Sequence, residues 1–428
     1  MEPYSHSVYL DSELCCGCTN CLKQCPTGAI RVRDGKAHIN GKFCIDCGKC
    51  IQVCTHHAKL PTFDNLSIIH DYKYTVALPA PALFGQFNNL EDPNIVLTAL
   101  IHMGFDDIYE VGSAAELVSE ETRKYVKSHP EQWPFISTAC PTVVRLIRVL
   151  FPNLIEHLLP IKPPIELAAE IARERAIKKT GLPSEDIGII FISPCPSKVS
   201  YVRNPFGVDK SQVDGVVAIR NVYKQILPYM NEAKESPMDL SEVGKIGIGW
   251  SLSGGESGGL LSDSYLAADG ITNVQKVLED LEDQKFEKLE FVELNACTGG
   301  CVGGVLNVEN PFVAKSKLKR LRKYMKVAGS HLEDNPIDNL YWTNEVEYEP
   351  IFRLGNNMME SFAMMNTVER LNSKFPGLDC GACGSPSCRA LAEDIVRGDG
   401  DETDCIYVMK QKLNQIYHDM NTELTFKL

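Results

Sequence analysis

A membrane-spanning helix needs about 20 consecutive apolar residues. The sequence has no such stretch, so we expect no membrane segment. It has little positive charge: 43 lysine and arginine residues stand against 56 acidic ones, and the net charge is −13. Because nucleic-acid binding usually rests on a basic surface, we expect no nucleic-acid partner. The opening MEPYSHSVYL has no basic segment followed by an apolar one, so we expect no signal peptide and a cytoplasmic location.

Cysteine, by contrast, is abundant, with 17 residues in a chain of 428. Disulfides are rare in the reducing cytoplasm, so another use of the thiols is expected. Nine cysteines lie between Cys15 and Cys54, four between Cys140 and Cys301, and four between Cys380 and Cys405. Clusters of this kind in a cytoplasmic chain indicate metal sites.

The amino-terminal cysteines form two runs with the spacing C-x2-C-x2-C-x3-C, which is typical of bacterial ferredoxins. A pair of zinc knuckles is the alternative. Cys16 is expected to be a spare thiol, and His56 and His57 to be surface residues. In the ferredoxin arrangement the fourth cysteine of each run ligates the other cluster, which predicts one [4Fe–4S] cluster on Cys15, Cys18, Cys21 and Cys54 and a second on Cys44, Cys47, Cys50 and Cys25.

The carboxy-terminal cysteines have the spacing C-x2-C-x4-C-x16-C. This resembles a small [4Fe–4S] module found in corrinoid and electron-transport proteins, and a zinc site is the alternative. The stretch RALAEDIV after the third cysteine predicts a short amphipathic helix. The resemblance implies that the ligands are Cys380, Cys383, Cys388 and Cys405.

Between about Tyr72 and Val327, short β-rich runs alternate with helical stretches, which predicts an α/β domain with a mostly parallel sheet. The expected strands are YTVALPA, DIYEVG, GIIFISP, GVVAI, KIGIGWS and FVELNA. Ligands in such sheets bind beyond the carboxyl ends of strands. Three strand ends are therefore expected to bring together Cys140, Cys195, Cys297 and Cys301, unless these are merely buried cysteines that happen to end strands.

The segments STACP, SPCPSK and NACTGGCVGG resemble the three signature segments of the [FeFe] hydrogenase catalytic domain, in the family's order. PAPALFGQF, GSAAELVSEE and GWSLSGG also resemble family segments, and the likeness covers roughly residues 70 to 330. The resemblance implies an H-cluster, in which the four cysteines hold a [4Fe–4S] cluster and Cys301 bridges to a two-iron unit carrying CO, cyanide and a dithiolate. Such a cofactor interconverts H2 with protons and electrons.

The same resemblance implies roles for residues around the two-iron unit. Lys198 would contact a cyanide, unless it is a surface lysine. Ala80 and Pro81 would form a wall of the iron pocket. Trp250 would lie near the cluster, although a plain core tryptophan is the alternative.

The chain departs from the family pattern on the proton route. The cysteine that precedes the first ligand in productive hydrogenases, and passes protons there, is replaced by Ala139. The acidic residue three positions after the lysine is replaced by Tyr201. The relay glutamates align with Thr122 and Tyr125, or with neighbouring Glu120 and Glu121 after a slip, and the methionines beside the cluster become Ser193 and Asn295.

Because a positioned proton-transfer group contributes about 10² to 10⁴ in rate, we expect slow turnover of H2. Glu256, in SGGESGG, is the expected substitute relay; a solvated loop glutamate is the alternative. Slow turnover favours an H2 or redox sensor, as in the sensory subset of the family. A metabolic, ferredoxin-linked hydrogenase with an unfamiliar proton route, and an iron–sulfur scaffold without the two-iron unit, are the competing hypotheses.

Three domains are expected: a two-cluster ferredoxin domain over residues 1–65, an H-cluster domain over 70–350, and an α-rich iron–sulfur module over 355–428. Ferredoxin is an expected redox partner. The last segment predicts a helix with an a/d seam, which would bind a signalling partner or a second copy, or would pack on its own domain. The seam residues are Ile406, Met409, Leu413, Ile416 and Met420.

Overall fold

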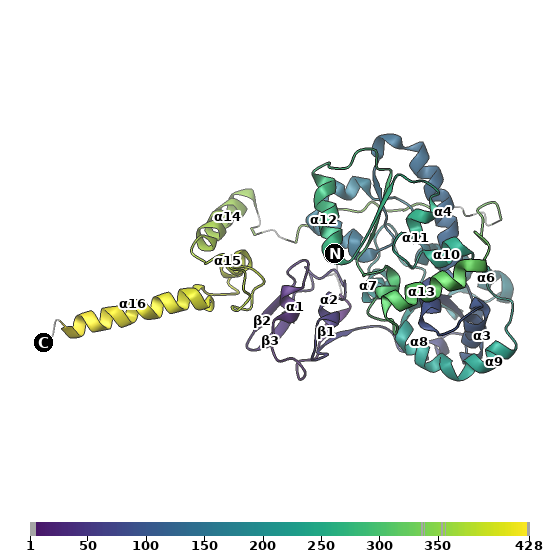
Figure 1. Ribbon diagram of the computed structural model, residues 1–428, viewed down its shortest axis with the longest axis horizontal. Coiled ribbons are helices and arrows are strands. Elements are labelled where there is room, and N and C mark those ends of the chain that lie inside the picture. Colours follow the sequence, from purple (N-terminus) through teal and green to yellow (C-terminus); the bar gives the residue numbers. More distant parts are fainter. Residues whose placement is uncertain (1–5, 335–336, 338, 352–353, 356, 426–428) are drawn as a thin grey trace. The chain divides into compact units, whose positions relative to one another are not determined.

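The computed structural model describes residues 6–334, 337, 339–351, 354–355 and 357–425 (Figure 1). The chain forms two compact units. The first unit contains residues 1–8, 45–48 and 61–349, and the second contains residues 9–44, 49–60 and 350–428. The expected boundaries of three domains stay a prediction.

A four-stranded parallel sheet forms the centre of the first unit, with the order β6-β5-β8-β9. Its strands are β5 (Tyr74–Pro79), β6 (Asp107–Ile108), β8 (Ile187–Ser193) and β9 (Gly215–Ala218). A second parallel sheet has the order β10-β11-β7 and consists of β7 (Phe135–Ile136), β10 (Tyr265–Asp269) and β11 (Phe291–Asn295). The predicted α/β class with parallel sheets is confirmed.

Helices cover both faces of the four-stranded sheet. Successive side chains of a strand point to opposite faces, so one strand contributes to a core on each side. Ile189 and Phe191 of β8 belong to one apolar core, and Ile190 and Ile192 belong to another. Helix α6 (Pro164–Thr180) contributes to the first core, whereas α3 (Pro93–Met103), α8 (Ile219–Ile226) and α13 (Pro311–Leu321) contribute to the second.

The remaining helices of this unit connect the strands and carry the site (Figure 1). They are α4 (Val111–Ser128), α5 (Pro141–Leu150), α7 (Pro196–Arg203), α9 (Met230–Glu235), α10 (Lys245–Gly249), α11 (Gly255–Gly259) and α12 (Ile271–Glu282). The expected strand KIGIGWS was wrong, since residues 245–249 form α10. A Cβ on Gly247 would lie 2.3 Å from the carbonyl oxygen of Gly112 on α4, so the glycine serves close helix packing rather than a strand.

The two cysteine runs fold as copies of each other. Each contains one short helix, α1 (Asn20–Lys23) or α2 (Lys49–Gln52). The Sγ of Cys25 accepts a hydrogen bond from the amide of Ala29 at 3.3 Å, and that of Cys54 from Ala58 at 3.2 Å. Three pairs of equivalent positions have φ between 51° and 73°: Gly17 and Asp46, Thr19 and Gly48, and Gly28 and His57.

The first run is followed by a hairpin of β2 (Ile30–Arg33) and β3 (Lys36–Ile39), and β1 (Val8–Leu10) pairs with β4 (Lys59–Pro61). The carboxy-terminal region is helical, as expected, with α14 (Met358–Asn372), α15 (Cys388–Arg397) and α16 (Ile406–Thr425). Helix α15 begins at the cap Ser387, whose side chain accepts from the amide of Ala390, and ends at Gly398. Within the described ranges, none of the helices combines the length and apolarity of a membrane crossing.

Candidate hydrogen-activating site

The four cysteines of the central region follow three different strands. Cys140 and Cys195 cap helices α5 and α7, each directly before a proline that starts the helix. Cys297 follows β11, and Cys301 begins a short 3₁₀-helix over Cys301–Gly303. These thiols therefore come from the carboxyl ends of strands in two sheets, where α/β proteins bind ligands.

Electrostatics shows that the four thiols are neighbours. Burial, followed by the charges of Cys195, Cys140 and Cys301, raises the pKa of Cys297 well above its ordinary value. Burial also raises the pKa of Cys301 to about 12. Thiols crowded together in a buried place ionise only if a cation joins them, and thiolate is the ligand that iron–sulfur clusters use. The donor set therefore fits a [4Fe–4S] cluster.

A buried cation lies among these thiols. Lys198, on α7, is 9% exposed, and its Nζ donates to the carbonyl oxygen of Ala139 at 3.1 Å. Burial acts to lower the pKa of this lysine, but the charges of the four cysteines, led by Cys301, outweigh it and raise the pKa above its ordinary value. The alternative of a surface lysine is wrong, and the ammonium group is placed to stabilise an anionic ligand.

Beside the thiols lies a small cavity with mostly apolar walls. Cys301 lines it, whereas Cys140, Cys195 and Cys297 stand outside its lining. Cys301 is thus placed to contact both the other thiols and a group in the cavity. Further expected site residues line the same cavity: Ala80, Pro81, Ala139, Lys198, Trp250, Glu256 and Asn295.

Glu256 is a buried residue of α11 and not a solvated loop residue, since only 5% of it is exposed. The Oγ of Ser137 donates to its carboxylate at 2.6 Å and accepts from the amide of Ala139 at 3.3 Å. Burial, and next the charge of Glu293, raises the pKa of Glu256 above its ordinary value. The carboxyl group of Glu256 can therefore hold a proton near neutral pH, and the hydroxyl of Ser137 joins it to the backbone of Ala139.

Sequence reasoning missed Glu293, which lies on β11 and lines the cavity. Its carboxylate accepts from the amides of Gly254 and Ser257 and from Asn295 Nδ2, at 2.8–2.9 Å. Burial raises its pKa as well. The available signal was a charged residue at a fully buried position of the apolar strand FVELN.

Several residues that we aligned with family positions on the proton route lie outside the lining of the cavity. Tyr201 is fully buried and packs edge-on against Phe206. Thr122 donates to the carbonyl oxygen of Val118 within its own helix, and Tyr125 stacks on His129. Glu120 accepts from the amide of Leu332, and Glu121 from the hydroxyl of Tyr341, so both carboxylates bind other parts of the chain.

Two further expected residues have local partners. The hydroxyl of Ser193 donates to the carbonyl oxygen of Cys195 at 2.9 Å, so it holds the backbone of that expected ligand without lining the cavity. The indole nitrogen of Trp250 donates to the Oγ of Ser119 at 2.8 Å, which fixes the ring in the cavity wall.

In the second unit, the first expected set of ferredoxin-type ligands lines one hollow. The charges of Cys18, Cys15 and Cys54 act on Cys21, so these thiols are neighbours. Lys59 also lines the hollow and is 2% exposed, and its Nζ has no hydrogen-bond partner among the described residues. A buried, unbonded ammonium group beside four thiols fits an anionic iron–sulfur cluster.

The remaining cysteines are placed as follows. Cys25, Cys44 and Cys50 are partly buried in the second unit, whereas Cys47 belongs to the first, where its charge acts on Cys297. Cys16, His56 and His57 are exposed. In the carboxy-terminal region, one small apolar core contains or contacts Cys383, Cys388 and Cys405, and the charge of Cys380 acts on Cys383.

The chain combines a parallel α/β unit, which carries four thiols and a lysine at its strand ends, with two ferredoxin-type cysteine runs. This combination defines an iron–sulfur protein of the hydrogenase type. The family profile "Iron only hydrogenase large subunit, C-terminal domain" matches residues 73–262 and 258–305, which is more than half of the chain. The chain belongs to this family. A "4Fe-4S dicluster domain" matches residues 7–55, and an Fe–S cluster profile matches residues 375–407.

Iron hydrogenase 1 of Clostridium pasteurianum is 22% identical over 305 residues, which are 58% of this chain and 53% of the relative. The NADP-reducing hydrogenase subunit HndD of Solidesulfovibrio fructosivorans is 22% identical over 388 residues, which are 70% of this chain and 64% of the relative. The chain thus spans just over half to about two thirds of these relatives. The structure of the [FeFe]-hydrogenase HydA(deltaEFG) is 15% identical, with a TM-score of 0.47, and the match covers 65% of this chain and 95% of that one.

Proposed function

We propose that the protein reversibly activates H2, converting it to two protons and two electrons, at an H-cluster held by Cys140, Cys195, Cys297 and Cys301. The observation that carries this proposal is the cavity that Cys301, Lys198 and Glu256 share. When bound, the two-iron unit would supply the metal chemistry that splits H2. The chain supplies an apolar cavity, a buried ammonium group and a proton-holding carboxyl group.

On the electron side, Cys47 and Cys297 belong to the same unit, and the charge of Cys47 acts on Cys297. Gly48 lies against Val305, just after the last ligand, with 3.0 Å between a Cβ on the glycine and the valine side chain. We infer that electrons pass between the cluster of the second cysteine run and the cubane here. A ferredoxin is the expected external redox partner.

On the proton side, the methyl group of Ala139 carries no exchangeable proton, so the route must use other groups. Glu256 lines the cavity itself, and the Ser137 hydroxyl, which donates to its carboxylate and accepts from the amide of Ala139, holds the carboxyl group beside the position of Ala139. Glu256 and Glu293 are both buried, and the charge on one disfavours the charge on the other. A single proton shared by this pair is therefore available near neutral pH, and turnover is slow because no thiol stands at position 139 to pass it on.

Slow turnover suits an H2 or redox sensor better than a metabolic enzyme. Helix α16 fits this role, since its seam residues are between 43% and 60% exposed. A signalling partner or a second copy of the chain would cover them. The seam consists of Ile406, Met409, Leu413, Ile416 and Met420.

A second candidate function is that of an iron–sulfur scaffold without the two-iron unit. It is favoured by a similarity to the "Probable cytosolic Fe-S cluster assembly factor oxy-4" of Caenorhabditis elegans, 25% identical over 219 residues, which are 40% of this chain and 48% of that protein. Against it stands the cavity beside Cys301, which a scaffold holding cubanes alone would not need.

Infrared spectroscopy of anaerobically matured protein tests the proposal. We expect sharp CO and cyanide bands that shift under H2, and their loss in a Cys301→Ala variant that still binds iron at the other sets. The absence of these bands, at about sixteen iron atoms per chain (four for each set of four cysteines), would refute H2 activation and leave the scaffold.

A further inference from the structure

The carboxy-terminal cysteine loop and strand β2 touch through their backbones within the second unit. The amide of Val32 donates to the carbonyl oxygen of Gly384 at 2.8 Å. Gly384 has φ +78°, and a Cβ at this position would lie 1.8 Å from the carbonyl oxygen of Val32. The loop therefore approaches the strand as closely as two backbones can, which only glycine permits.

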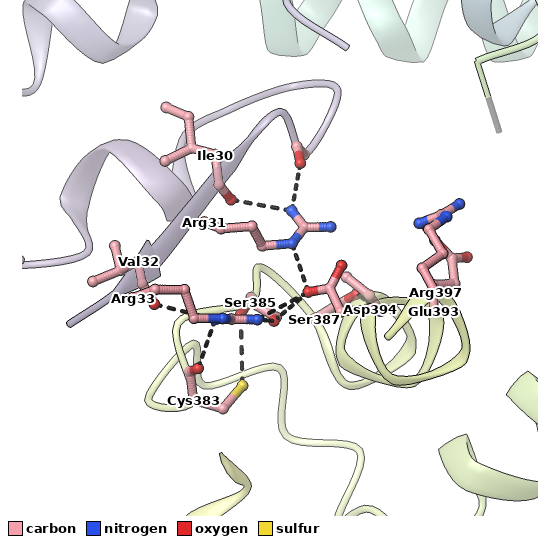
Figure 2. A network of polar contacts seen from close by, with 12 residues as sticks. Ile30, Arg31, Val32, Arg33, Cys383, Ser385, Ser387, Glu393, Asp394 and Arg397 are labelled. Atoms are coloured by element: carbon pink, nitrogen blue, oxygen red, sulfur yellow. Dashed lines mark hydrogen bonds and ion pairs between the residues drawn. The ribbon is translucent and has the colours of Figure 1, made fainter. Parts of the chain in front are cut away.

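A buried carboxylate holds this contact in place (Figure 2). Asp394 of α15 is 5% exposed, and its Oδ2 accepts from Arg31 Nε at 2.7 Å and from Arg33 at 3.1 Å. Ser385 donates to the same oxygen at 2.7 Å. Arg31 and Arg33 lie two residues apart on one face of β2, and their guanidinium groups converge on one buried acid. Removing the partners of a buried charge is destabilising.

Figure 2 shows that the two arginines also reach backbone on both sides of the contact. Arg33 donates to the carbonyl oxygen of the expected ligand Cys383 at 3.0 Å. Arg31 donates to the carbonyl oxygen of Gly28 at 2.6 Å, three residues after the expected ligand Cys25. The contact thus ties together backbone that belongs to two different cysteine sets.

The segments next to these cysteines are also in contact. A Cβ on Gly381 would lie 3.2 Å from the side chain of Leu22 and 3.3 Å from that of Lys23. Leu22 and Lys23 stand between Cys21 and Cys25, and Gly381 follows Cys380. Cys25 and Pro386 line one shared hollow. Electron exchange falls steeply with distance, so two cluster-binding loops in direct contact are placed to exchange electrons.

We propose that the carboxy-terminal four-cysteine module exchanges electrons directly with the amino-terminal ferredoxin-type clusters across the contact made by Asp394, Arg31 and Arg33. The inference rests on the clusters proposed above. One electron leaves a reduced [4Fe–4S] cluster of the ferredoxin-type part and reduces an oxidised [4Fe–4S] cluster of the module, with no bond made or broken. The module is then a second end of the electron relay and follows its redox state.

The test uses the full chain with its clusters, reduced by dithionite and not by H2, so a failure of H2 activation leaves it valid. The variant is Arg31→Gln with Arg33→Gln, which removes both charges and alters no cysteine. Lys374→Gln is the matched control, because Lys374 forms an exposed ion pair with Glu402 inside the module. A Cys380→Ser variant identifies the magnetic signal of the module's cluster.

We expect magnetic coupling between the module's reduced cluster and the ferredoxin-type clusters in the electron paramagnetic resonance of the wild type and of Lys374→Gln. In the double variant the module's signal should remain while its coupling is lost, and the Val32 amide should lose its protection from hydrogen exchange. An uncoupled signal, or no paramagnetic cluster in the wild-type module, would overturn the proposal. The proposal would also be overturned if the double variant kept both the magnetic coupling and the protection of the Val32 amide from hydrogen exchange. If the double variant loses the cluster, Asp394→Asn is measured in the same two ways and the same results decide.

Discussion

Glu256→Gln is the substitution that separates a substitute proton relay from a buried structural carboxylate. Glutamine keeps the shape of the side chain and can still accept the hydrogen bond of Ser137, which is 2.6 Å long in the wild type. It cannot take up or release a proton at the carboxyl position. A loss of rate in this variant therefore reports proton transfer and not the loss of a contact.

The expected magnitude follows from the role of a single positioned group. Such a group contributes about 10² to 10⁴ in rate, which is roughly 3–5 kcal/mol in the activation free energy. Glu256→Asp should be intermediate, because a side chain shorter by about 1.5 Å lengthens the contact with Ser137 beyond hydrogen-bonding distance. The buried carboxyl band in the infrared spectrum should disappear in Glu256→Gln, since the raised pKa of Glu256 keeps it protonated in part.

The assay is H2 oxidation with a dye as electron acceptor, together with exchange between H2 and D2O, in two backgrounds. Ala139→Cys restores a thiol at the position where the family carries its proton donor. In that background Glu256→Gln should cost far less than in the wild type, because the direct route no longer needs Ser137 and Glu256. The double-mutant cycle isolates this coupling.

Glu290→Gln is the control, since Glu290 accepts from Ser262 at 3.0 Å and stands outside the cavity lining. Equal losses from Glu256→Gln in both backgrounds would show that Glu256 is structural and that the proton takes another path. A wild-type rate in both would rule out any role for this carboxyl group.

Two other expectations follow from the site and the fold. Gly303→Ala should abolish binding of the cubane, because the new Cβ would lie 2.1 Å from the carbonyl oxygen of Thr298. Iron and sulfide content measure this binding. Gly258→Ala is the control and should bind iron normally, since a Cβ at Gly258 meets open space. Burial raises the pKa of Glu166 from 4.5 to about 7, so its share of stability is present below pH 4.5 and is lost as the pH rises through about 7. The stability of Glu166→Gln relative to the wild type should therefore rise between pH 5 and pH 8, by up to about 3 kcal/mol in the free energy of unfolding. Melting temperatures of both proteins at each pH measure this difference, and a constant difference over that range would contradict the shift.

The sequence predicted those features that depend on local spacing. The ferredoxin runs, the parallel α/β class and the strand ends that carry Cys140, Cys195 and Cys297 all follow from short-range pattern. The helix after Cys388 likewise follows from its cap and its periodicity. In each case the residues that specify the element lie within one turn or one strand of it.

Features that depend on contacts between distant parts of the chain were not predicted. The segment around Gly247 alternates like a strand, but its glycines serve packing against Gly112 on α4, which no local pattern reveals. Glu293 lies in an apolar strand and becomes informative only when Glu256 and Cys301 line the same cavity. The convergence of Arg31 and Arg33 on Asp394 joins residues more than 350 positions apart, and their alternation along β2 is that of any surface strand.

The departures of this chain from the family pattern concern protons, whereas the residues expected to hold the clusters are present. The four thiols and Lys198 act on one another, and the charge of Cys47 acts on Cys297, so the proposed electron route has its groups in place. Ala139 stands where the family pattern places the group that delivers protons, and the carboxyl group of Glu256 lines the same cavity and is bonded to Ser137. Under the proposed function, a site that exchanges electrons readily but protons slowly would come to redox balance with H2 without sustaining a large flux. It would report the H2 level through the oxidation state of its clusters, and the module that Asp394 ties to β2 would receive that signal.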